Sequence, residues 1–298
     1  MNTPYSWQLV IVLWGTKYGV AEVNHLIHAV RAHSSQPPRV VLITDRPRDG
    51  LAADVITRPF PAFFLQPDFL RGGCQAKLSL FEAGVVPDDL PAIFMDLDTV
   101  VLGDMARFLA LQTTPQTIAI FQSAILPFGA LGRAVWRATS GRRYARGNSS
   151  IVVYHPRECG FIAERFRALF GQHGHCGIKP MVADERFVSW AAQPMMRAIP
   201  RHMAVKFPTE FMLPWRWLIH LRARLPWNQR RWAGLLAVTL PGVDLKGQDL
   251  SNLAEGTEIV DRKGRRLIWT DRALGPVRGR IIAYYRALQG DSRQDGQP

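Results

Sequence analysis

The sequence predicts an α/β fold, and three observations indicate it. Short runs rich in Val and Ile alternate with a helical pattern over the first 45 residues. An apolar run in the middle of the chain ends in two acids, Asp96-Leu97-Asp98. After residue 212 the sequence becomes basic and rich in tryptophan. Buried strands that alternate with amphipathic helices are typical of a sheet flanked by helices.

Strands and helices are predicted in order along residues 1–212. Apolar runs predict strands over residues 9–14, 39–44, 54–60, 92–95, 117–122 and 150–154. Apolar residues at helical spacing predict helices around residues 23–30, over 75–83, after Asp104, and over 161–170 and 183–192. The strand–helix–strand start is typical of a right-handed parallel unit.

Residues 213–298 form a second, basic part of the chain. Short strands are predicted over residues 236–240, 258–261 and 266–269, and a closing helix over 276–288. Residues 201–298 hold 17 Lys/Arg against 9 Asp/Glu, which is +8 of the total net charge of +13. This excess favours a polyanionic partner, either nucleic acid or an anionic membrane surface.

The bulk composition limits the class of protein. The 298 residues suffice for one or two domains, and no apolar run approaches the roughly 20 residues of a membrane-spanning helix. No basic region precedes the first apolar run, so we expect no signal peptide and a cytoplasmic protein, with a peripheral place on the inner face of the membrane as an option. Cys74, Cys159 and Cys176 are scattered, which favours free thiols over a zinc site or disulfides.

Asp96 and Asp98 are the strongest chemical signal. Side chains alternate along a strand, so these two carboxylates point the same way. They would repel each other unless they share a cation or a proton. Oxygen ligands suit Mg²⁺ or Mn²⁺, and such an ion commonly holds a diphosphate. The alternative is a surface loop with two solvated acids.

Several short segments, taken in order, resemble the GT-A-fold glycosyltransferases, in the style of the family-eight-like bacterial enzymes. The resemblance covers roughly residues 8–210. Its segments are Leu13-Trp14-Gly15-Thr16-Lys17-Tyr18-Gly19, Leu42-Ile43-Thr44-Asp45, Gln75-Ala76-Lys77-Leu78-Ser79-Leu80-Phe81, Met95-Asp96-Leu97-Asp98-Thr99-Val100, Gly147-Asn148-Ser149-Ser150-Ile151-Val152 and Ala183-Asp184-Glu185-Arg186-Phe187. Each segment is weak by itself, and their order carries the resemblance.

The resemblance implies a mixed GT-A sheet over residues 1–212 that binds a nucleotide sugar, UDP-type by preference, with residues 213–298 as an extension toward acceptor or membrane. Asp98 would bind the metal, and Asp96 the metal or the donor's ribose. Asp184, or less favourably Glu185, would lie by the reacting carbon. The other implied donor contacts are Trp14, Gly15, Thr16, Lys17, Tyr18, Asp45, Lys77, Leu97, Asn148 and Ser149.

Simpler interpretations stay open for these residues. Lys77 fits a solvated helix position, and Trp14 fits the core. Asp45 fits a turn with Arg46-Pro47, and Asp184 fits a helix N-cap. Asn148-Ser149 fits a turn before a strand.

One departure from the related families concerns the metal. They often supply a late His in a His-x-x-Gly-x-x-Lys-Pro segment, and we find no such segment. Only His202 and His220 follow residue 175, and neither has that context. The metal would then have fewer protein ligands, completed by diphosphate and water, or metal dependence would be lost.

The basic Trp segment, residues 215–232, allows three interpretations: a packing element with a charged face, a surface for anionic lipid, or nucleic-acid binding. No recognised nucleic-acid module supports the third, so we expect no nucleic acid.

Together these features predict transfer of a sugar to a hydroxyl acceptor, a glycan or a lipid-linked one as in envelope polysaccharide assembly. The metal would offset charge on the leaving diphosphate. One alternative is a haloacid-dehalogenase-like phosphatase, with Asp96 as nucleophile, Asp98 as acid, and Lys179 and Asp184-Glu185 in later roles. Another is a non-catalytic basic binding protein.

Overall fold

The fold is taken from a computed structural model, which describes residues 5–72, 74–122, 126–240 and 247–294. The chain divides into two compact units. The first consists of Met1–Val20, Ser35–Asp96 and Ala106–Ile199, and the second of Ala21–Ser34, Leu97–Met105 and Pro200–Pro298. Each unit is described by itself.

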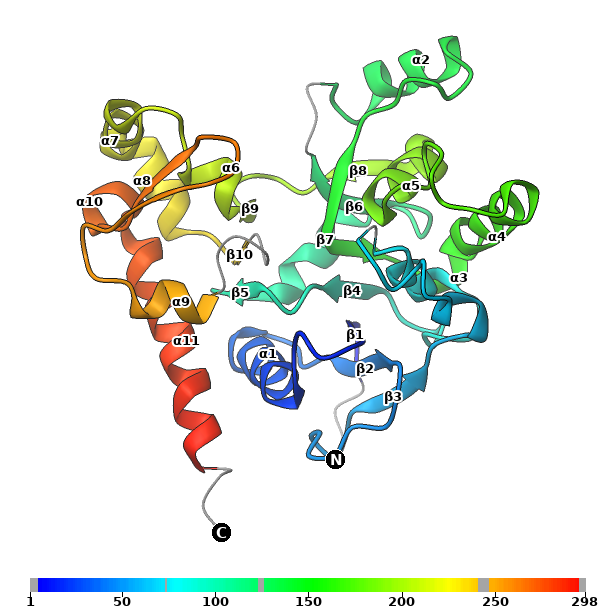
Figure 1. The fold of residues 1–298 in the computed structure, drawn as a ribbon, viewed down its shortest axis with the longest axis horizontal. Helices are drawn as coiled ribbons and strands as arrows, with labels where there is room; N and C mark the ends of the chain where they lie inside the picture. The colour runs from blue at the N-terminus through cyan, green and yellow to red at the C-terminus, as the bar shows by residue number, and fades with distance from the viewer. Residues whose placement is uncertain (1–4, 73, 123–125, 241–246, 295–298) are drawn as a thin grey trace. The chain divides into compact units, whose positions relative to one another are not determined.

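A seven-stranded mixed sheet forms the centre of the first unit, in the order β3-β2-β1-β4-β7-β6-β8 (Figure 1). Its strands are β1 (Gln8–Leu13), β2 (Arg39–Thr44), β3 (Ile56–Pro59), β4 (Ala92–Met95), β6 (Ile118–Gln122), β7 (Gly147–Tyr154) and β8 (Met196–Ala198). The strands β3, β2, β1 and β4 are parallel, and β7 runs antiparallel to both β4 and β6. Strand β1 is buried along its whole length, as expected of a strand covered on both faces.

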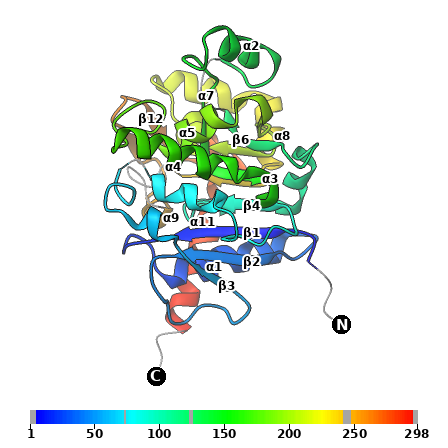
Figure 2. The ribbon, with the colours of Figure 1, turned by 90° about the vertical axis from the view of Figure 1, so that its right-hand side faces the viewer.

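Helices pack against this sheet through an aromatic core. The helical elements of the first unit are η1 (Ala62–Leu65), η2 (Gln75–Phe81), α2 (Ala130–Ala138), α3 (Pro156–Cys159), α4 (Phe161–His173), α5 (Asp184–Ala191) and η4 (Gln193–Met195), and η3 (Met105–Leu111) begins at its boundary. Figure 2 shows α3, α4 and α5 in front of the strands. Phe166 of α4 lies 5.4 Å from Phe69 and 5.0 Å from Phe187 between ring centroids. These rings join α4 and α5 into one apolar layer.

The second unit is built around a smaller sheet, β5 (Thr99–Val101), β10 (Ala237–Thr239) and β9 (Ala204–Lys206). The middle strand, β10, is antiparallel to β5 and parallel to β9. Strands β11 (Glu258–Val260) and β12 (Arg266–Ile268) form a hairpin. Its helices are α1 (Val20–His33), α6 (Phe207–Phe211), α7 (Arg216–Arg224), α8 (Pro226–Ala233), α9 (Gly247–Asn252), α10 (Asp271–Leu274) and α11 (Pro276–Gln294).

A single buried acid, Glu210 of α6, ties three elements of the second unit together. Its carboxylate accepts hydrogen bonds from Arg222 at 2.6 Å, Arg231 at 2.5 Å, Arg201 at 2.9 Å and the indole N–H of Trp232 at 2.9 Å. Burial by itself would raise the pKa of Glu210, but these donors lower it below its ordinary value. The ionised acid therefore fastens α7 and α8 to α6.

The predicted strands of the sheet are confirmed. Most contain an apolar run, whereas β3 is polar and mostly exposed, and β7 begins with Gly147-Asn148-Ser149-Ser150 before its apolar half. The predicted helix over residues 75–83 is instead a 3₁₀ helix, η2, that ends at Phe81. The residues after Asp104 also form a 3₁₀ helix, η3, with Met105 and Phe108 buried. Within the described ranges, no helix combines the length and the apolarity needed to cross a membrane.

Candidate active site

Two loops at the carboxyl ends of β1 and β2 are joined by Asp45. Its carboxylate accepts a hydrogen bond from the backbone N–H of Gly15 at 3.0 Å and pairs with Arg48 at 2.7 Å. Burial raises the pKa of Asp45, but Gly15, Arg48 and Arg46 together lower it. Gly15 adopts a positive φ of 64°, which a residue with a side chain rarely adopts. Asp45 thus has a more definite role than a simple turn: it fixes the loop after β1.

The other residues of the first loop differ in exposure. Trp14 is half-buried, and its indole N–H donates to the carbonyl of Leu70 at 3.2 Å. Thr16 and Lys17 are exposed, and the Lys17 ammonium lies 4.8 Å from the ring centroid of Tyr18. Trp14 thus packs against the core, as the simpler interpretation expected, and the loop presents the exposed Lys17 cation beside the end of β1.

Lys77 and Asp96 form a close ion pair at the end of β4. The Lys77 Nζ lies 2.6 Å from Asp96 Oδ1, and both side chains are less than a fifth exposed. The backbone N–H of Asp96 donates to the carbonyl of Ser150 in β7, which fixes Asp96 at the sheet edge. The interpretation of Lys77 as a solvated helix residue is therefore wrong.

Strand β7 and helix α5 bring four predicted residues together. The Ser149 hydroxyl donates to Asp184 Oδ2 at 2.6 Å, and the Asn148 amide donates to Glu185 Oε2 at 2.7 Å. Asn148 and Ser149 lie inside β7 and not in a turn before it. Asp184 is the first residue of α5, whose N-cap is Ala183. The two simpler interpretations, turn and N-cap, are both wrong.

The ionisable groups of this cluster shift one another. Burial raises the pKa of Asp184 to about 6, although Lys77 and Ser149 partly oppose the shift. Burial would lower the pKa of Lys77, but Asp96 and Asp184 raise it well above its ordinary value. The chain therefore holds a permanent cation, Lys77, beside a carboxyl group that titrates near neutral pH. Strongly shifted groups gathered at a sheet edge are typical of functional sites.

Sequence reasoning did not identify Cys74 and Arg48 as parts of the site. Cys74 precedes η2 with a positive φ of 53°. Burial raises the pKa of its thiol, Lys77 opposes this shift, and the charges of Asp184 and Asp96 add to it. No sequence signal indicates that backbone geometry. Arg48 follows Asp45 at i+3, and that spacing of opposite charges could have suggested the pair.

Asp98 and Leu97 belong to the second unit. The carbonyl of Asp98 accepts a hydrogen bond from the N–H of Leu240, which begins the pairing of β5 with β10. His202, one of the two late histidines, is exposed in a turn before β9.

The implied divalent cation can be tested against these residues. Asp96 and Asp98 offer carboxylate oxygens, which Mg²⁺ and Mn²⁺ prefer. Across the described ranges, no group of three or more His, Cys, Asp or Glu side chains is placed to hold a metal ion. Asp96 is also already paired with Lys77. Asp96 and Asp98 thus have the oxygen chemistry that such a cation prefers, but the described residues offer no set of three side-chain ligands for it.

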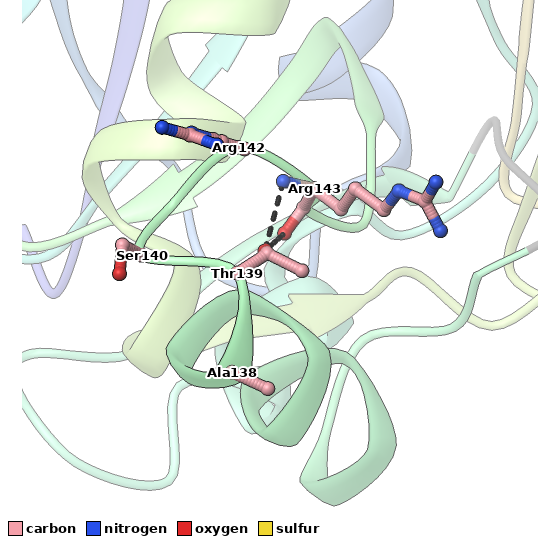
Figure 3. A pocket seen from close by; sticks show the side chains of 5 residues that line it. All are labelled: Ala138, Thr139, Ser140, Arg142 and Arg143. Carbon is pink, nitrogen blue, oxygen red and sulfur yellow. Dashed lines mark hydrogen bonds between the residues drawn. The ribbon is translucent and has the colours of Figure 1, made fainter.

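A separate pocket lies at the loop after α2 and contains none of the predicted site residues (Figure 3). It is lined by Ala138, Thr139, Ser140, Arg142 and Arg143. The Thr139 hydroxyl accepts a hydrogen bond from the N–H of Arg143 at 3.0 Å and closes the loop on itself. Among the described residues, the lining of this pocket contains no carboxylate, histidine or cysteine that could act as an acid or a base.

Comparison with known proteins identifies the fold. No protein-family model matches the chain, and no curated protein sequence is significantly similar to it. The galactosyltransferase LgtC, solved with donor and acceptor sugar analogues, matches with a TM-score of 0.57 at 10% identity, over 94% of this chain and 95% of its own. This chain has the GT-A fold. The predicted α/β class and mixed sheet are therefore confirmed.

Two further structures agree. The bifunctional glycosyltransferase WbbM matches with a TM-score of 0.54 at 12% identity, over 95% of this chain and 52% of its own. The apo form of the glycosyltransferase GlyE of Streptococcus pneumoniae TIGR4 matches with 0.53 at 11% identity, over 98% of this chain and 64% of its own. At such low identity the likeness concerns the fold alone, and residue roles must be argued from the site.

Proposed function

We propose that this chain is a glycosyltransferase that moves a sugar from a nucleoside-diphosphate donor, UDP-type by preference, to a hydroxyl of a glycan acceptor. The observation that carries the proposal is the Lys77–Asp96–Asp184 cluster, in which Asp184 is buried and the other two side chains are less than a fifth exposed. It lies where β4 ends in a GT-A sheet, and ligands of open α/β sheets bind outside the carboxyl ends of strands.

Charge compensation at the leaving diphosphate is the task of Lys77. Its high pKa keeps the ammonium charged at every physiological pH, and Asp96 holds it at a fixed position. A fixed cation costs no reorganisation when charge develops on the leaving group. A divalent ion held by Asp96 and Asp98, when bound, would add Lewis-acid stabilisation of the same charge.

The carboxyl group of Asp184 is the reactive acid of the proposed site. Above pH 6 it is ionised and can stabilise an oxocarbenium-like sugar or accept the proton of the acceptor hydroxyl. The Ser149 hydroxyl donates to one of its oxygens, Oδ2, at 2.6 Å and so holds the carboxyl group in place. The Asn148 amide holds Glu185 beside it, as a second carboxylate of the sugar pocket.

The phosphatase alternative is disfavoured by the fold and by Lys179. The chain has the GT-A fold, with four strands of the sheet, β1 to β4, before Asp96. The phosphatase needs its lysine at the reacting phosphate, but Lys179 is exposed. The non-catalytic alternative does not account for the shifted acid Asp184, because a binding surface needs no titrating group near neutral pH.

A thermal-shift screen and a donor-turnover assay test the proposal. UDP, GDP, ADP and CDP are added to the protein with Mn²⁺, with Mg²⁺ and with EDTA. A nucleotide at 100 times its Kd should stabilise the fold by about 2.7 kcal/mol. Release of UDP from UDP-sugars is then measured in the presence of simple glycan acceptors, and proton NMR of the product gives its stereochemistry.

Matched variants link the assay to the site. Lys77→Met and Asp184→Asn should reduce turnover on the order of 100-fold. Asp68→Asn, at an exposed acid in the same unit, should leave it unchanged. Two results would overturn the proposal: no nucleoside diphosphate shifts the melting temperature, or the protein hydrolyses p-nitrophenyl phosphate through a phosphoenzyme.

A further inference from the structure

Four large apolar side chains are exposed within 13 residues of the second unit. Trp215 is 58% exposed, Trp217 63%, Leu221 48% and Trp227 65%. They belong to α7 and α8 and to the residue that caps α7 (Figure 1). Exposed apolar side chains are ordinary when single, but a cluster marks an interaction surface. We call these four residues the Trp face.

The 3.6-residue repeat of helix α7 places its buried side chains on one side and those of the Trp face on the other. Ile219 and Ala223, four residues apart, are buried in the core of the second unit. Trp217 and Leu221, also four residues apart, follow the opposite side of the helix. The rings of Trp215 and Trp217 are stacked, with centroids 6.3 Å apart and planes 18° apart. The stacked rings form one continuous apolar surface.

Positive charge borders the Trp face. Arg224 follows Leu221 by three residues along α7, Arg230 lies on α8, and both are exposed. Within the part of the chain that the structure describes, no ion pair joins either of them to a carboxylate. Burial lowers the pKa of His220, and the charges of Arg272, Arg224 and Arg216 lower it further. Arg216 pairs with Glu258 at 3.4 Å, so the positive potential beside the Trp face rests on Arg224 and Arg230.

The two helices that carry the face are firmly attached to the unit. Arg222 of α7 and Arg231 of α8 both bond to the buried carboxylate of Glu210. Trp232 of α8 is buried and packs against Phe211 at 5.1 Å between centroids. Arg222 and Arg231 thus stabilise the fold through Glu210, whereas the exposed tryptophans of the Trp face and the exposed arginines beside it make no such bond to Glu210.

We propose that the Trp face docks onto the surface of an anionic lipid bilayer. Indole rings favour the boundary between headgroups and acyl chains, and arginines beside them pair with anionic headgroups. Each basic residue near such a surface contributes a factor of roughly five in affinity. The face is short and lies on helices too polar to cross the bilayer, so the protein binds at the surface. The inference does not depend on the proposed transferase activity.

Co-sedimentation with vesicles tests the proposal on the full chain. We expect binding to vesicles of phosphatidylglycerol and phosphatidylcholine in equal parts, and little binding to pure phosphatidylcholine. Binding should weaken between 50 mM and 500 mM NaCl, because salt screens the arginines. Trp217→Ala with Trp227→Ala should weaken binding on the order of tenfold or more. Arg224→Gln with Arg230→Gln should act similarly and remove part of the salt dependence.

Two control variants have equal chemistry away from the face. Leu131→Ala removes an apolar side chain that is 59% exposed in the first unit, and Arg58→Gln removes an exposed arginine there. Both should bind vesicles as the wild type does. Quenching of indole fluorescence by brominated phosphatidylglycerol gives a second readout for the wild-type protein, and the double Trp variant, which keeps only Trp215 of the three exposed indoles, should show less of it.

Three results would overturn the proposal. The first is equal binding to neutral and anionic vesicles, or none to either. The second is vesicle binding that the double Trp variant retains in full. The third is a dimer in light scattering that the double Trp variant abolishes, because the face would then bind a second copy of the chain.

Discussion

Replacing Asp184 by Asn is expected to stabilise the protein at neutral pH. Burial raises the pKa of Asp184 to about 6, compared with an ordinary value of 3.8. This difference of about two pH units corresponds to roughly 3 kcal/mol, at about 1.4 kcal/mol per unit. Asn has nearly the same shape and still accepts the hydrogen bond of Ser149, but it carries no charge into the site.

The pH dependence of this gain has a definite sign. Between about pH 4 and pH 6 the folded protein keeps a proton on Asp184 that the unfolded chain has lost. The stability of the wild type therefore falls as the pH rises through this window, and the loss is complete above pH 6. The Asn variant has no such loss. The gain in stability from the substitution should be small below pH 4 and reach its full value above pH 6.

Thermal and urea unfolding at pH 4, 5, 6 and 7.5 measure the difference. A gain of about 3 kcal/mol raises the melting temperature by roughly 6–12 °C, at 2–4 °C per kcal/mol for a domain of this size. Asp68→Asn, at an exposed acid, should show no pH-dependent gain. The reasoning is refuted if Asp184→Asn is less stable than the wild type at pH 7.5, or if its gain is the same at every pH.

Three other substitutions probe different parts of the chain. Glu210→Gln should lower the free energy of unfolding in urea by roughly 3–5 kcal/mol, since it leaves three guanidinium groups around a neutral amide. The control is Glu255→Gln, at a side chain that is 61% exposed, which should lower it by less than about 0.5 kcal/mol. Equal losses in the two variants would contradict the argument. Lys77→Met should move the acidic limb of the pH–rate profile to higher pH, because the Lys77 charge lowers the pKa of Asp184. An acidic limb at the same pH in both proteins would show that Lys77 does not affect the titration of Asp184. Gly147→Ala should lower the free energy of unfolding by roughly 1–3 kcal/mol, because the added methyl group would lie 2.0 Å from a side-chain carbon of Ile120. Gly171→Ala, at an open position in a helix, should raise it by roughly 0.5–1 kcal/mol.

The sheet could be predicted because its strands are local apolar runs. Residues 39–44 and 92–95 were placed to the residue, since burial on both faces requires unbroken Val, Ile, Leu or Phe. The three-residue strands β8 and β9 have no such run. Helix α2 was not predicted, although it contains Leu131, Val135 and Trp136. The antiparallel direction of β7 depends on residues far apart in sequence, which no local pattern carries.

The structure brings together Lys77, Asp96, Ser149 and Asp184, which the sequence analysis had named for a donor site, and their binding of a donor stays a prediction. The pairing among them was not predicted. Asp96 was expected to contact a metal ion or the donor's ribose, whereas its partner in the structure is Lys77 at 2.6 Å. The spacing of the two acids indicates that a cation lies beside them. It does not distinguish a metal ion from the ammonium group of Lys77, 19 residues earlier in the chain.

The pairing of β6 with β7 has a practical consequence for redesign. Gln122, where β6 ends, is paired with Gly147, where β7 begins, so the chain leaves and re-enters the sheet at one ladder step. The next residues of β7 are Asn148 and Ser149. Helix α2 therefore lies between two positions that are fixed by one pair of the sheet, next to Asn148 and Ser149. Replacing α2 by a helix of another sequence should leave the hydrogen bonds of Asn148 and Ser149 to Glu185 and Asp184 in place.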